Sequence, residues 1–394
     1  MVHPHIFAGG AEKAVVYLGQ NLKQMGHEVS IATLSTDYSK IPFASQDIAY
    51  IKPEVEISNS NDGTLSGTVS MTIREASGMR ELLKDAWKKF DVCVPGNFPA
   101  YWSTYHLSSH MPVVWLCSEV LGPYGVTKDA YERSPVFRAL FKAAVVIDKR
   151  VVKKSVHEIV ACSDFCGAMV KERYGRDAHV AYTGVDYDYF SEGIDKAKAK
   201  KKFDLDKSYV LLHVGFMVKR KNQILSIRAV KRLLREMPDL KLVLVGGGPL
   251  ETVLKEEVNR LGLDDHVIFM GSVDEETLRA LYYACDINLY PTEDQTFGLV
   301  PFEAIACGRV SVISGCAGAA RLLKDVDAAV IVNPAVEEIV AAVRRIRREQ
   351  VDVEGMVKRG KRFVGGCLTW DAYSKVVAGI LEKARIHFLA VNHN

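Results

Sequence analysis

The sequence predicts an α/β protein of two domains built on parallel sheets, and three observations support this fold class. The 394 residues, of which 48% are hydrophobic and 25% charged, suffice for two globular cores. Short β-branched runs alternate with longer amphipathic stretches in two successive series, which is typical of parallel sheets with helices on both faces. Residues 191–208 are polar and lysine-rich without an apolar period, so we expect an interdomain linker there.

The first series defines a domain over residues 1–190. Its predicted strands are 27–34, 90–94, 112–117, 158–162 and 178–182, with helices over 11–26 and 163–175. The chain reaches a Gly-Gly turn after a few residues, so the first strand is expected to be unusually short. A start of the protein upstream of residue 1 is the alternative explanation for this short strand. Residues 58–70 are rich in Ser, Asn and Gly and predict an exposed loop, with a binding loop as the alternative.

The second series is more regular and defines a domain over residues 209–366. Its predicted strands are 209–214, 241–245, 266–270, 286–290, 309–313 and 328–332, and its helices include 222–237 and 337–350. Residues 367–394 form a further helical stretch.

Composition excludes several classes of function. A net charge of +3 and a pI near 8.3 are too mild for nucleic-acid binding but suit a small anionic ligand. The eight cysteines contain no C-x-x-C pair, Cys162 and Cys166 being the closest, which argues against a zinc ribbon or a disulfide framework and favours a cytosolic protein. No apolar run is long enough to span a bilayer, and no signal-peptide layout begins the chain.

The most informative segment is Tyr290–Gly308, which follows a predicted strand with an acidic, glycine-containing loop and then enters a helix carrying Glu303. A helix N-terminus at the carboxyl end of a parallel strand is where an open α/β sheet binds phosphate. Glu303, about one turn into the helix, can accept hydrogen bonds from two vicinal hydroxyls, as a ribose would offer. A helix cap beside an incidental acidic loop is the competing interpretation.

A second segment brings three cations to the mouth of the same sheet. After the strand that ends at Gly215, Lys219, Arg220 and Lys221 precede a helix beginning near Asn222. Such cations can neutralise a diphosphate in place of a metal, although this segment alone would more simply be a solvated basic loop.

These segments resemble family four retaining glycosyltransferases, which have the two-domain GT-B fold: two Rossmann-like α/β/α domains whose parallel sheets face a central cleft. The resemblance extends in order over nearly the whole chain, through GGGP at Gly246–Pro249, HVIFMGSV at His266–Val273 and GCAGAARLL at Gly315–Leu323. The family's Glu-x7-Glu signature implies that Glu303 binds the donor ribose. The first glutamate position is Gln295, which would contact hydroxyls of the transferred sugar without a negative charge. Phe216 stands where the family usually has arginine.

The resemblance implies the following site. Catalytic residues would be Glu303, Lys221 and Gln295, and the donor-binding residues would be Gly215, Lys219, Arg220, Gly247, Gly271, Phe297, Gly298, Leu299 and Glu303. Acceptor-side residues would be Gly9, Gly10, Asn97 and Glu119, with Trp102 and Trp115 in the same region, although singly each is more simply structural. Ser118 replaces a histidine that family members often carry, so Glu119, His106, His110 or the donor phosphate would have to activate the acceptor.

Two further helical stretches carry predictions, the first from its composition and the second from the resemblance. Residues 134–154 combine bulky apolar side chains with many cations, so the helix would either lie on an anionic membrane leaflet or bury one face and solvate its basic side. The closing stretch 367–394 would cross back onto the N-terminal domain, with Trp370 packed at the junction.

The expected function is metal-independent, retaining transfer of a sugar from a nucleoside-diphosphate sugar, UDP- or GDP-linked, to a glycan or lipid-linked acceptor. The two domains would close on the donor, and the departing diphosphate would act as the base. No cofactor beyond this substrate and no nucleic-acid partner are expected, and the protein would be cytoplasmic, with peripheral contact at the inner face of the cell membrane as an option. The alternatives are a non-catalytic sugar-nucleotide-binding subunit and, less favoured, a nucleotide-sugar epimerase.

Overall fold

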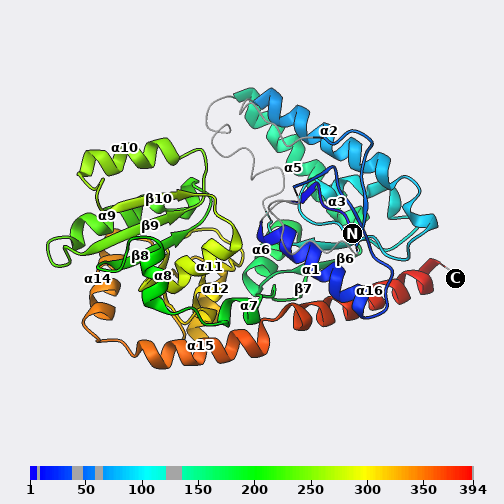
Figure 1. The fold of residues 1–394 in the computed structure, drawn as a ribbon. Helices are drawn as coiled ribbons and strands as arrows, with labels where there is room; N and C mark the ends of the chain where they lie inside the picture. The colour runs from blue at the N-terminus through cyan, green and yellow to red at the C-terminus, as the bar shows by residue number, and fades with distance from the viewer. Residues whose placement is uncertain (7–8, 38–47, 58–64, 121–134, 393–394) are drawn as a thin grey trace. The chain divides into compact units, whose positions relative to one another are not determined.

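The computed structural model describes residues 1–6, 9–37, 48–57, 65–120 and 135–392 (Figure 1). It divides the chain into two compact units. Unit 1 consists of Met1–Gly184 together with Trp370–Asn394, and unit 2 of Val185–Thr369. The chain therefore leaves unit 1 six residues earlier than the expected boundary at 190, and returns to it near the expected position 367.

Unit 2 contains a six-stranded parallel sheet in the order β10-β9-β8-β11-β12-β13. Each strand overlaps one of the six predicted for this half of the chain, which confirms those predictions. The bounds are β8 (Tyr209–Val214), β9 (Leu240–Val245), β10 (Val267–Gly271), β11 (Ile287–Tyr290), β12 (Val310–Ser314) and β13 (Val330–Val332). Numbered by their order along the chain, the strands lie as 3-2-1-4-5-6, which is the arrangement of a doubly wound sheet. The strand order reverses between β8 and β11, and this point is the switch point of the sheet.

Helices cover both faces of this sheet, which is why its strands are almost continuously apolar (Figure 1). Residues of α9 (Gln223–Leu233), α10 (Glu251–Leu261) and α14 (Val336–Arg347) share one core with Leu211, Leu242 and Leu244 of the strands. The helix α12 (Val300–Ala306) packs on β11, β12 and α15 (Val353–Cys367), while α11 (Glu275–Ala284) contacts β8.

The expected linker at 191–208 folds onto unit 2 instead. It contains the end of α7 (Tyr187–Ser191) and all of α8 (Lys196–Lys202), which packs against α11. Both Lys196 and Lys200 bind the carboxylate of Asp286, at 2.6 and 2.8 Å, and Asp195 caps the helix. The missing apolar period was misleading because ion pairs rather than an apolar face anchor this helix.

The sheet of unit 1 is parallel and interrupted. Its named strands are β1 (His5–Ile6), β2 (Ser30–Ala32), β3 (Ser35–Thr36), β4 (Ala49–Ile51), β5 (Val114–Cys117), β6 (Glu158–Ala161) and β7 (His179–Val180). The strands pair as β1-β3, β2-β4 and β5-β6-β7. Single bridges Val2–Ala32, Val2–Pro95 and Cys93–Val113 connect these groups, so the first segment of the chain is central in the strand order, as β8 is in unit 2. The predicted strand 90–94 is thus reduced to a single bridge at Cys93.

Helices of unit 1 differ from the expectations mainly at residues 65–70. This part of the predicted loop begins α2 (Leu65–Leu83), and residues 58–64 lie outside the described residues. The other α-helices in the described part of this unit are α1 (Gly10–Gln24), α3 (Ala100–Ser103), α5 (Pro135–Ser155), α6 (Asp164–Tyr174) and α16 (Trp370–Asn392). Over the described ranges, no helix is both long and apolar enough to cross a bilayer.

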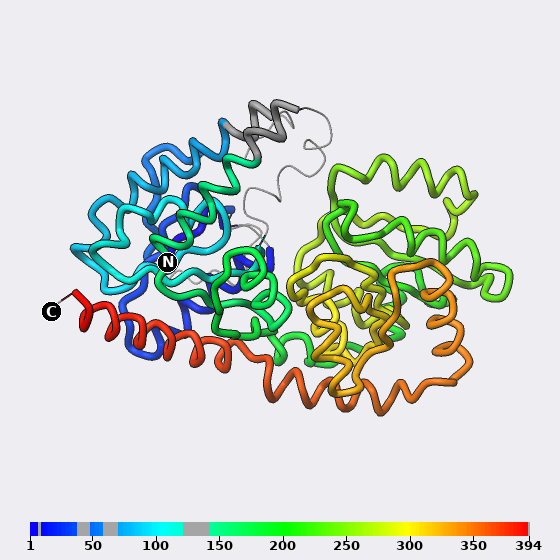
Figure 2. The backbone as a smooth tube through the Cα atoms, turned by 180° about the vertical axis from the view of Figure 1, so that it is seen from behind, coloured from blue at the N-terminus to red at the C-terminus, as the bar shows by residue number. Residues whose placement is uncertain are grey.

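The terminal helix α16 belongs to the core of unit 1. Trp370 stacks on Tyr17 of α1 with ring centroids 4.6 Å apart, and Val377 is buried beside Leu18 and Leu22. Figure 2 shows α16, in red, running along the same side of unit 1 as α1, in blue. The two ends of the chain are therefore packed together in one core.

Candidate functional site

The loops that follow the strands of unit 2 bring the predicted donor residues to one edge of its sheet. Gly215–Lys221 follow β8, the glycine turn Gly246–Gly248 follows β9, and residues 291–299 follow β11. Because the strand order reverses between β8 and β11, the carboxyl ends of these two strands flank the crevice where such sheets bind ligands.

A lysine and an amide meet at this crevice. The ammonium of Lys221 donates to the side-chain oxygen of Gln295 over 2.8 Å and lies 3.4 Å from the hydroxyl of Tyr290. It also lies over the Tyr290 ring, 5.2 Å from the centroid. Tyr290 was not predicted as a site residue, although its place as the last residue of a strand at the switch point was a usable signal.

The two loops on either side of the crevice are fastened to each other. The side-chain amide of Asn222 donates to the carbonyl of Pro291 and the carboxylate of Glu293, at 3.0 and 2.9 Å. The backbone N–H of Glu293 donates to the carbonyl of Arg220 over 2.8 Å. Asn222 has a left-handed backbone with φ of 56°, which asparagine tolerates better than most residues. The cation loop is therefore held against the acidic loop rather than left solvated by itself.

The glycine turn after β9 lies directly against the backbone of the β8 loop. A Cβ atom on Gly246 would lie 2.4 Å from the carbonyl oxygen of Gly215, and one on Gly248 would lie 2.7 Å from the backbone of Met217. Both glycines also have positive φ. The carbonyl of Gly247 accepts the N–H of Met217 over 2.7 Å. Glycine is thus required here for close backbone approach.

A second close approach shapes the loop before α12. A Cβ on Gly298, whose φ is +96°, would lie 2.2 Å from the hydroxyl of Tyr290. A Cβ on Gly318, at the start of α13 (Gly318–Asp325), would lie 1.9 Å from the carbonyl oxygen of Thr296. The N–H of Gly318 donates to the carbonyl of Gln295 over 2.7 Å. The loop after β12 therefore supports the backbone that presents Gln295, a role that the sequence analysis did not assign to Gly318.

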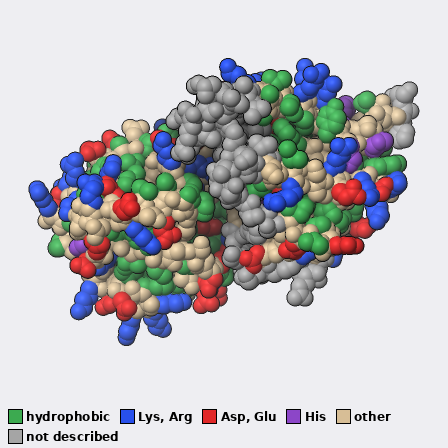
Figure 3. Space-filling model, turned by 90° about the horizontal axis from the view of Figure 1, so that it is seen from above, with side chains coloured by type: hydrophobic (Ala, Val, Ile, Leu, Met, Phe, Trp, Pro, Cys, Tyr) green, Lys and Arg blue, Asp and Glu red, His purple; other side chains and the backbone are tan. Residues whose placement is uncertain are grey.

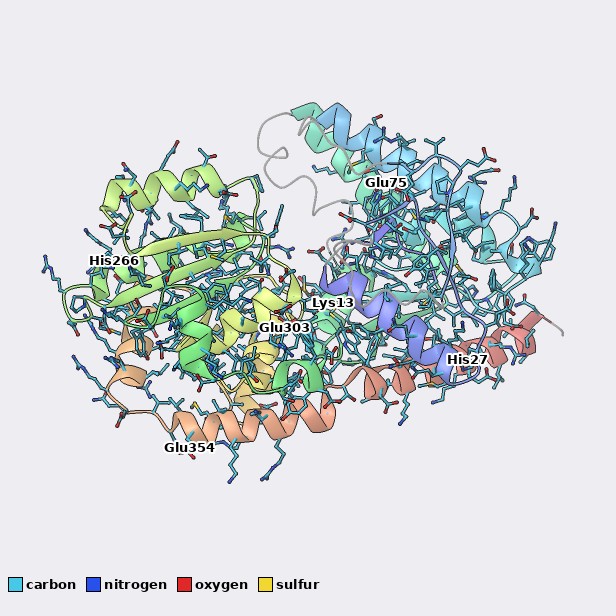
Figure 4. The ribbon with its side chains drawn as sticks, viewed as in Figure 1. Lys13, His27, Glu75, His266, Glu303 and Glu354 are labelled. Carbon is cyan, nitrogen blue, oxygen red and sulfur yellow. The ribbon has the colours of Figure 1, made fainter. Side chains whose placement is uncertain are left out.

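Glu303 lies on α12 and is only 6% exposed (Figure 4). One carboxylate oxygen accepts a hydrogen bond from the hydroxyl of Tyr282 over 2.8 Å. Burial, together with the nearby charge of Glu303, raises the pKa of Tyr282, so the phenol stays protonated and can serve as the donor. Tyr282 was not predicted, because α11 reaches α12 only in the folded structure.

The other predicted donor residues occupy different kinds of position. Lys219 and Arg220 lie in a 3-10 turn with Lys221, with Lys219 exposed, and Gly271 ends β10 with a left-handed φ of 63°. Leu299 caps α12 and is partly exposed. The ring of Phe297 is buried and stacks on Phe302 with centroids 5.0 Å apart, so this residue shapes the loop and can offer a ligand only its backbone.

A buried histidine lies in the strand that leads to the cation loop. His213 in β8 is 1% exposed and its Nδ1 lies 2.9 Å from the hydroxyl of Ser226. Burial and, second, the positive charge of Lys221 lower the pKa of His213 to about 3. This imidazole is therefore neutral at physiological pH and adds no positive charge to the site.

In unit 1, the structure brings Asn97 and Glu119 together at the carboxyl edge of the sheet. The side-chain oxygen of Asn97 accepts the backbone N–H groups of Ser118 and Glu119, both over 3.1 Å. Gly9 is the N-cap of α1 and Gly10 its first residue, so the Gly-Gly pair begins the helix as expected. Asn97 thus holds the loop that carries Glu119, rather than being directed only to a ligand.

The other nominated acceptor-side residues separate into core and edge positions. Trp115 is fully buried against Tyr101, so its expected place in a cleft is wrong for the side chain. Trp102 donates its indole N–H to Asp148 over 2.9 Å. His106 and His110 precede β5, at its amino end, whereas Glu119 follows its carboxyl end. Glu119 is therefore better placed than either histidine for ligand chemistry.

A buried polar chain near the end of β1 was not predicted. The ring of His5 lies 2.7 Å from the hydroxyl of Ser35 through Nδ1 and 2.9 Å from the carboxylate of Glu75 through Nε2. All three side chains are at most 7% exposed, and Glu75 comes from α2 (Figure 4). The pairing fastens α2 to the edge of the sheet.

The basic helix α5 buries one face and exposes its cations, which is the second of its two predicted arrangements, while contact with a membrane stays a prediction. It buries Asp148, Val152 and Ser155, while Val146 and Ile147 are 63% and 50% exposed. The same helix carries exposed cations at Lys142, Lys149, Arg150, Lys153 and Lys154. Elsewhere on the described surface visible in Figure 3, basic and acidic side chains are interspersed.

Two further features bear on what can bind. Among the described residues, no group of three or more His, Cys, Asp or Glu side chains is arranged to hold a metal ion. A cavity of about 360 Å³ in unit 1 is lined by Met1, Ser30, Val92 and Glu382 among others, at the amino ends of the strands. It therefore lies at the sheet edge opposite Asn97 and Glu119.

Comparison with known proteins finds glycosyltransferase family models matching both halves of the chain. The family "Glycosyl transferases group 1" matches residues 195–363, and "Glycosyltransferase Family 4" matches residues 8–189. A GDP-mannose-dependent alpha-(1-6)-phosphatidylinositol monomannoside mannosyltransferase from Mycolicibacterium smegmatis is 29% identical over 212 residues, which is 51% of this chain and about half, 55%, of that protein. A D-inositol 3-phosphate glycosyltransferase from Salinispora tropica is 27% identical over 96% of this chain and 81% of its own.

Solved structures share the fold. Anabaena Alr3699/HepE in complex with UDP-glucose superposes with a TM-score of 0.76 and 17% sequence identity, covering 97% of this chain and 98% of that one. This superposition supports a common GT-B architecture. With 17% sequence identity it does not identify the ligands of this chain.

Proposed function

Because the chain belongs to the group 1 glycosyltransferases of family four, we propose that it transfers a sugar from a nucleoside-diphosphate sugar to an acceptor hydroxyl. The observation that carries this proposal is the pairing of Lys221 with Gln295 at the switch point of the unit 2 sheet. A cation and an amide are the groups needed to hold a diphosphate and the hydroxyls of a neighbouring sugar. The UDP-glucose complex of the HepE relative supports a nucleotide-sugar donor of this kind.

In the proposed donor complex, Lys221 contacts the diphosphate, assisted by Arg220 or Lys219. Glu303 holds two ribose hydroxyls. Its hydrogen bond from Tyr282 orients the carboxylate, and a carboxylate can accept several hydrogen bonds at once. In this complex Gly247, Gly271 and Gly298 let the backbone approach the nucleotide, because glycine has no side chain to obstruct it. Within the protein, a Cβ would have room at Gly247 and at Gly271, whereas at Gly298 it would meet the hydroxyl of Tyr290.

We propose transfer with retention of anomeric configuration. The bond between the sugar and the diphosphate loosens first, the acceptor hydroxyl attacks from the same face, and the departing diphosphate accepts the hydroxyl proton. Lys221 would stabilise the charge that develops on the leaving group, so the proposal assigns no role to a metal ion. Anomeric coupling constants in the NMR spectrum of the first product would distinguish retention from inversion.

The acceptor is proposed to be a glycan or a lipid-linked sugar. Glu119 is the candidate acidic residue on the acceptor side, and its backbone N–H is held by the side-chain oxygen of Asn97. The exposed Val146 and Ile147 among the cations of α5 support peripheral binding to an anionic leaflet, and with it a cytoplasmic location at the inner face of the membrane. Vesicle co-sedimentation with and without phosphatidylserine, using Val146→Asp, tests this contact.

A thermal-shift titration with UDP-, GDP- and ADP-glucose in EDTA tests the donor site. One nucleotide should stabilise the wild-type protein, and Glu303→Ala should abolish that shift. The matched control is Glu354→Ala, which removes an exposed glutamate of α15 far along the chain from the site loops (Figure 4). If the three nucleotides shift wild type and Glu303→Ala equally, the donor site is wrongly placed.

A non-catalytic sugar-nucleotide-binding subunit is the second candidate, because Gln295, Phe216 and Ser118 all depart from the family pattern. It would show nucleotide stabilisation without turnover on any acceptor. A nucleotide-sugar epimerase, the lesser alternative, would convert the donor with no acceptor present. Product analysis with and without acceptor separates the three functions.

A further inference from the structure

An exposed aromatic ring stands at the end of the central strand of unit 2. The side chain of Phe216, the second residue after β8, is 60% exposed. Unit 2 lies wholly within the described residues, and its exposed large hydrophobic side chains are Phe216 and Val253. The aromatic residues beside the site are buried instead: Tyr282, Tyr290, Phe297 and Phe302. Exposure forgoes the stabilisation that burial of a phenylalanine gives, so core packing does not account for this residue.

The backbone of Phe216 is firmly positioned although its ring is exposed. Its carbonyl accepts hydrogen bonds from the N–H of Val218 over 2.9 Å and from the side-chain amide of Gln223 over 3.2 Å. The next residue, Met217, donates its N–H to Gly247 over 2.7 Å. A ring on a fixed backbone loses little conformational freedom when a ligand stacks on it.

The neighbours of Phe216 in its loop belong to the proposed donor site. The turn Gly246–Gly248 has no side chains, and it approaches the backbone of Gly215 and Met217, the residues before and after Phe216. Five residues along the chain, Lys221 presents its ammonium to Gln295. Phe216 therefore belongs to the loop that also carries Lys221, the proposed diphosphate contact, and its backbone lies beside a turn without side chains.

We propose that Phe216 is a stacking platform for a ring of the donor and thereby a specificity-determining residue. This inference rests on the proposed function and assigns a contact within the same site. The electron-rich face of phenylalanine stacks on a flat nucleobase or on the C–H face of a sugar, and it cannot replace the phosphate contact of an arginine. The phosphate contact then falls to Lys221, and the ring selects the donor by its apolar face.

Isothermal titration calorimetry tests the proposal with two ligand sets. The first set is UDP, GDP and ADP, and the second is UDP-, GDP- and ADP-glucose. Each ligand is titrated into wild type, Phe216→Ala, Phe216→Tyr and the control Val253→Ala. We expect Phe216→Ala to weaken binding of the preferred nucleotide sugar by about 5- to 100-fold, which is the usual effect of removing one stacking ring. Phe216→Tyr should restore binding, and Val253→Ala should bind as wild type does.

The ligand pairs distinguish the two sources of the stacked ring. An equal loss for the diphosphate and its glucose ester identifies the nucleobase, whereas a loss confined to the glucose ester identifies the sugar. Unchanged binding by Phe216→Ala, or failure of Phe216→Tyr to restore it, overturns the inference while the proposed function stands. If wild type binds none of the six ligands, the proposed function fails and this inference fails with it.

Discussion

The ammonium of Lys221 lies 2.8 Å from the side-chain oxygen of Gln295, joining loops that are 74 residues apart in the chain. The partner atom is a neutral amide oxygen at a position where the family usually has a carboxylate. The contact therefore orients the lysine without neutralising it, which leaves its charge for an anionic ligand.

Removing this ammonium should weaken diphosphate binding. We expect Lys221→Ala to raise the Kd for the preferred nucleoside diphosphate by about 10- to 100-fold, because a charge-assisted hydrogen bond is lost. The measurement is isothermal titration calorimetry at two salt concentrations. Lys201→Ala, which removes an exposed lysine of α8, is the matched control and should leave the Kd unchanged. Equal weakening by both substitutions would mean that the loss of one positive charge, rather than a contact of Lys221 with the diphosphate, explains the change in Kd.

A carboxylate at position 295 should compete with the ligand for Lys221. We expect Gln295→Glu to weaken nucleoside diphosphate binding by about five-fold, since an ion pair at this distance contributes about 1 kcal/mol where it is partly exposed. Titration of Gln295→Leu, which removes the hydrogen bond without adding charge, separates the two effects. A larger loss in Gln295→Leu than in Gln295→Glu would show that orientation, rather than charge, governs the site.

The close approach at Gly318 should not tolerate a side chain. Gly318→Ala would place a Cβ 1.9 Å from the carbonyl oxygen of Thr296, so the loop that presents Gln295 must move. We expect a loss of about 2 kcal/mol in unfolding free energy, together with weaker nucleotide binding. Gly366→Ala is the control, because this glycine of α15 lies outside the proposed site and nothing would come within 4 Å of its Cβ. Thermal melts and titrations of both variants check this, and a near-native Gly318→Ala would contradict the described loop contact.

His213 should make the stability of unit 2 fall in mild acid. Its pKa drops from the ordinary 6.5 to about 3 on folding, so the unfolded chain binds the proton more tightly. The stabilisation is complete above about pH 6.5 and is lost progressively as the pH falls toward 3. Between pH 7 and pH 5 we expect a loss of about 2 kcal/mol that His213→Asn does not show. Denaturant unfolding at both pH values measures it, and parallel pH dependence in the two proteins would rule His213 out.

The sequence was a good guide to unit 2 and a weaker one to unit 1. All six strands of unit 2 could be predicted because both faces of that sheet are covered, so its strands are continuous apolar runs such as 209–214. In unit 1 the pairing is interrupted, and the apolar run 90–94 forms only a bridge at Cys93. Apolar character marked that segment as buried, but it could not reveal how few backbone pairs it makes.

At the site, sequence reasoning found residues that carry charge and missed those that position them. Lys221 and Glu303 stood out by residue type and by their place after predicted strands. Tyr282 and Gly318 act through contacts with Glu303 and Thr296, and these pairs meet only after folding. The linker was misread for a related reason, since Asp286, the partner of Lys200, lies 86 residues further along.

The placement of α16 has a consequence for the order in which the protein matures. Unit 2 is one continuous segment, whereas unit 1 needs Trp370 and Val377 to cover α1. As the chain emerges from the ribosome, the part synthesised first must wait with Leu18 and Leu22 uncovered until the whole of unit 2 has been made. Unit 2 can therefore reach its final form before unit 1 does, and chains interrupted before residue 370 would expose an apolar surface that chaperones and proteases recognise.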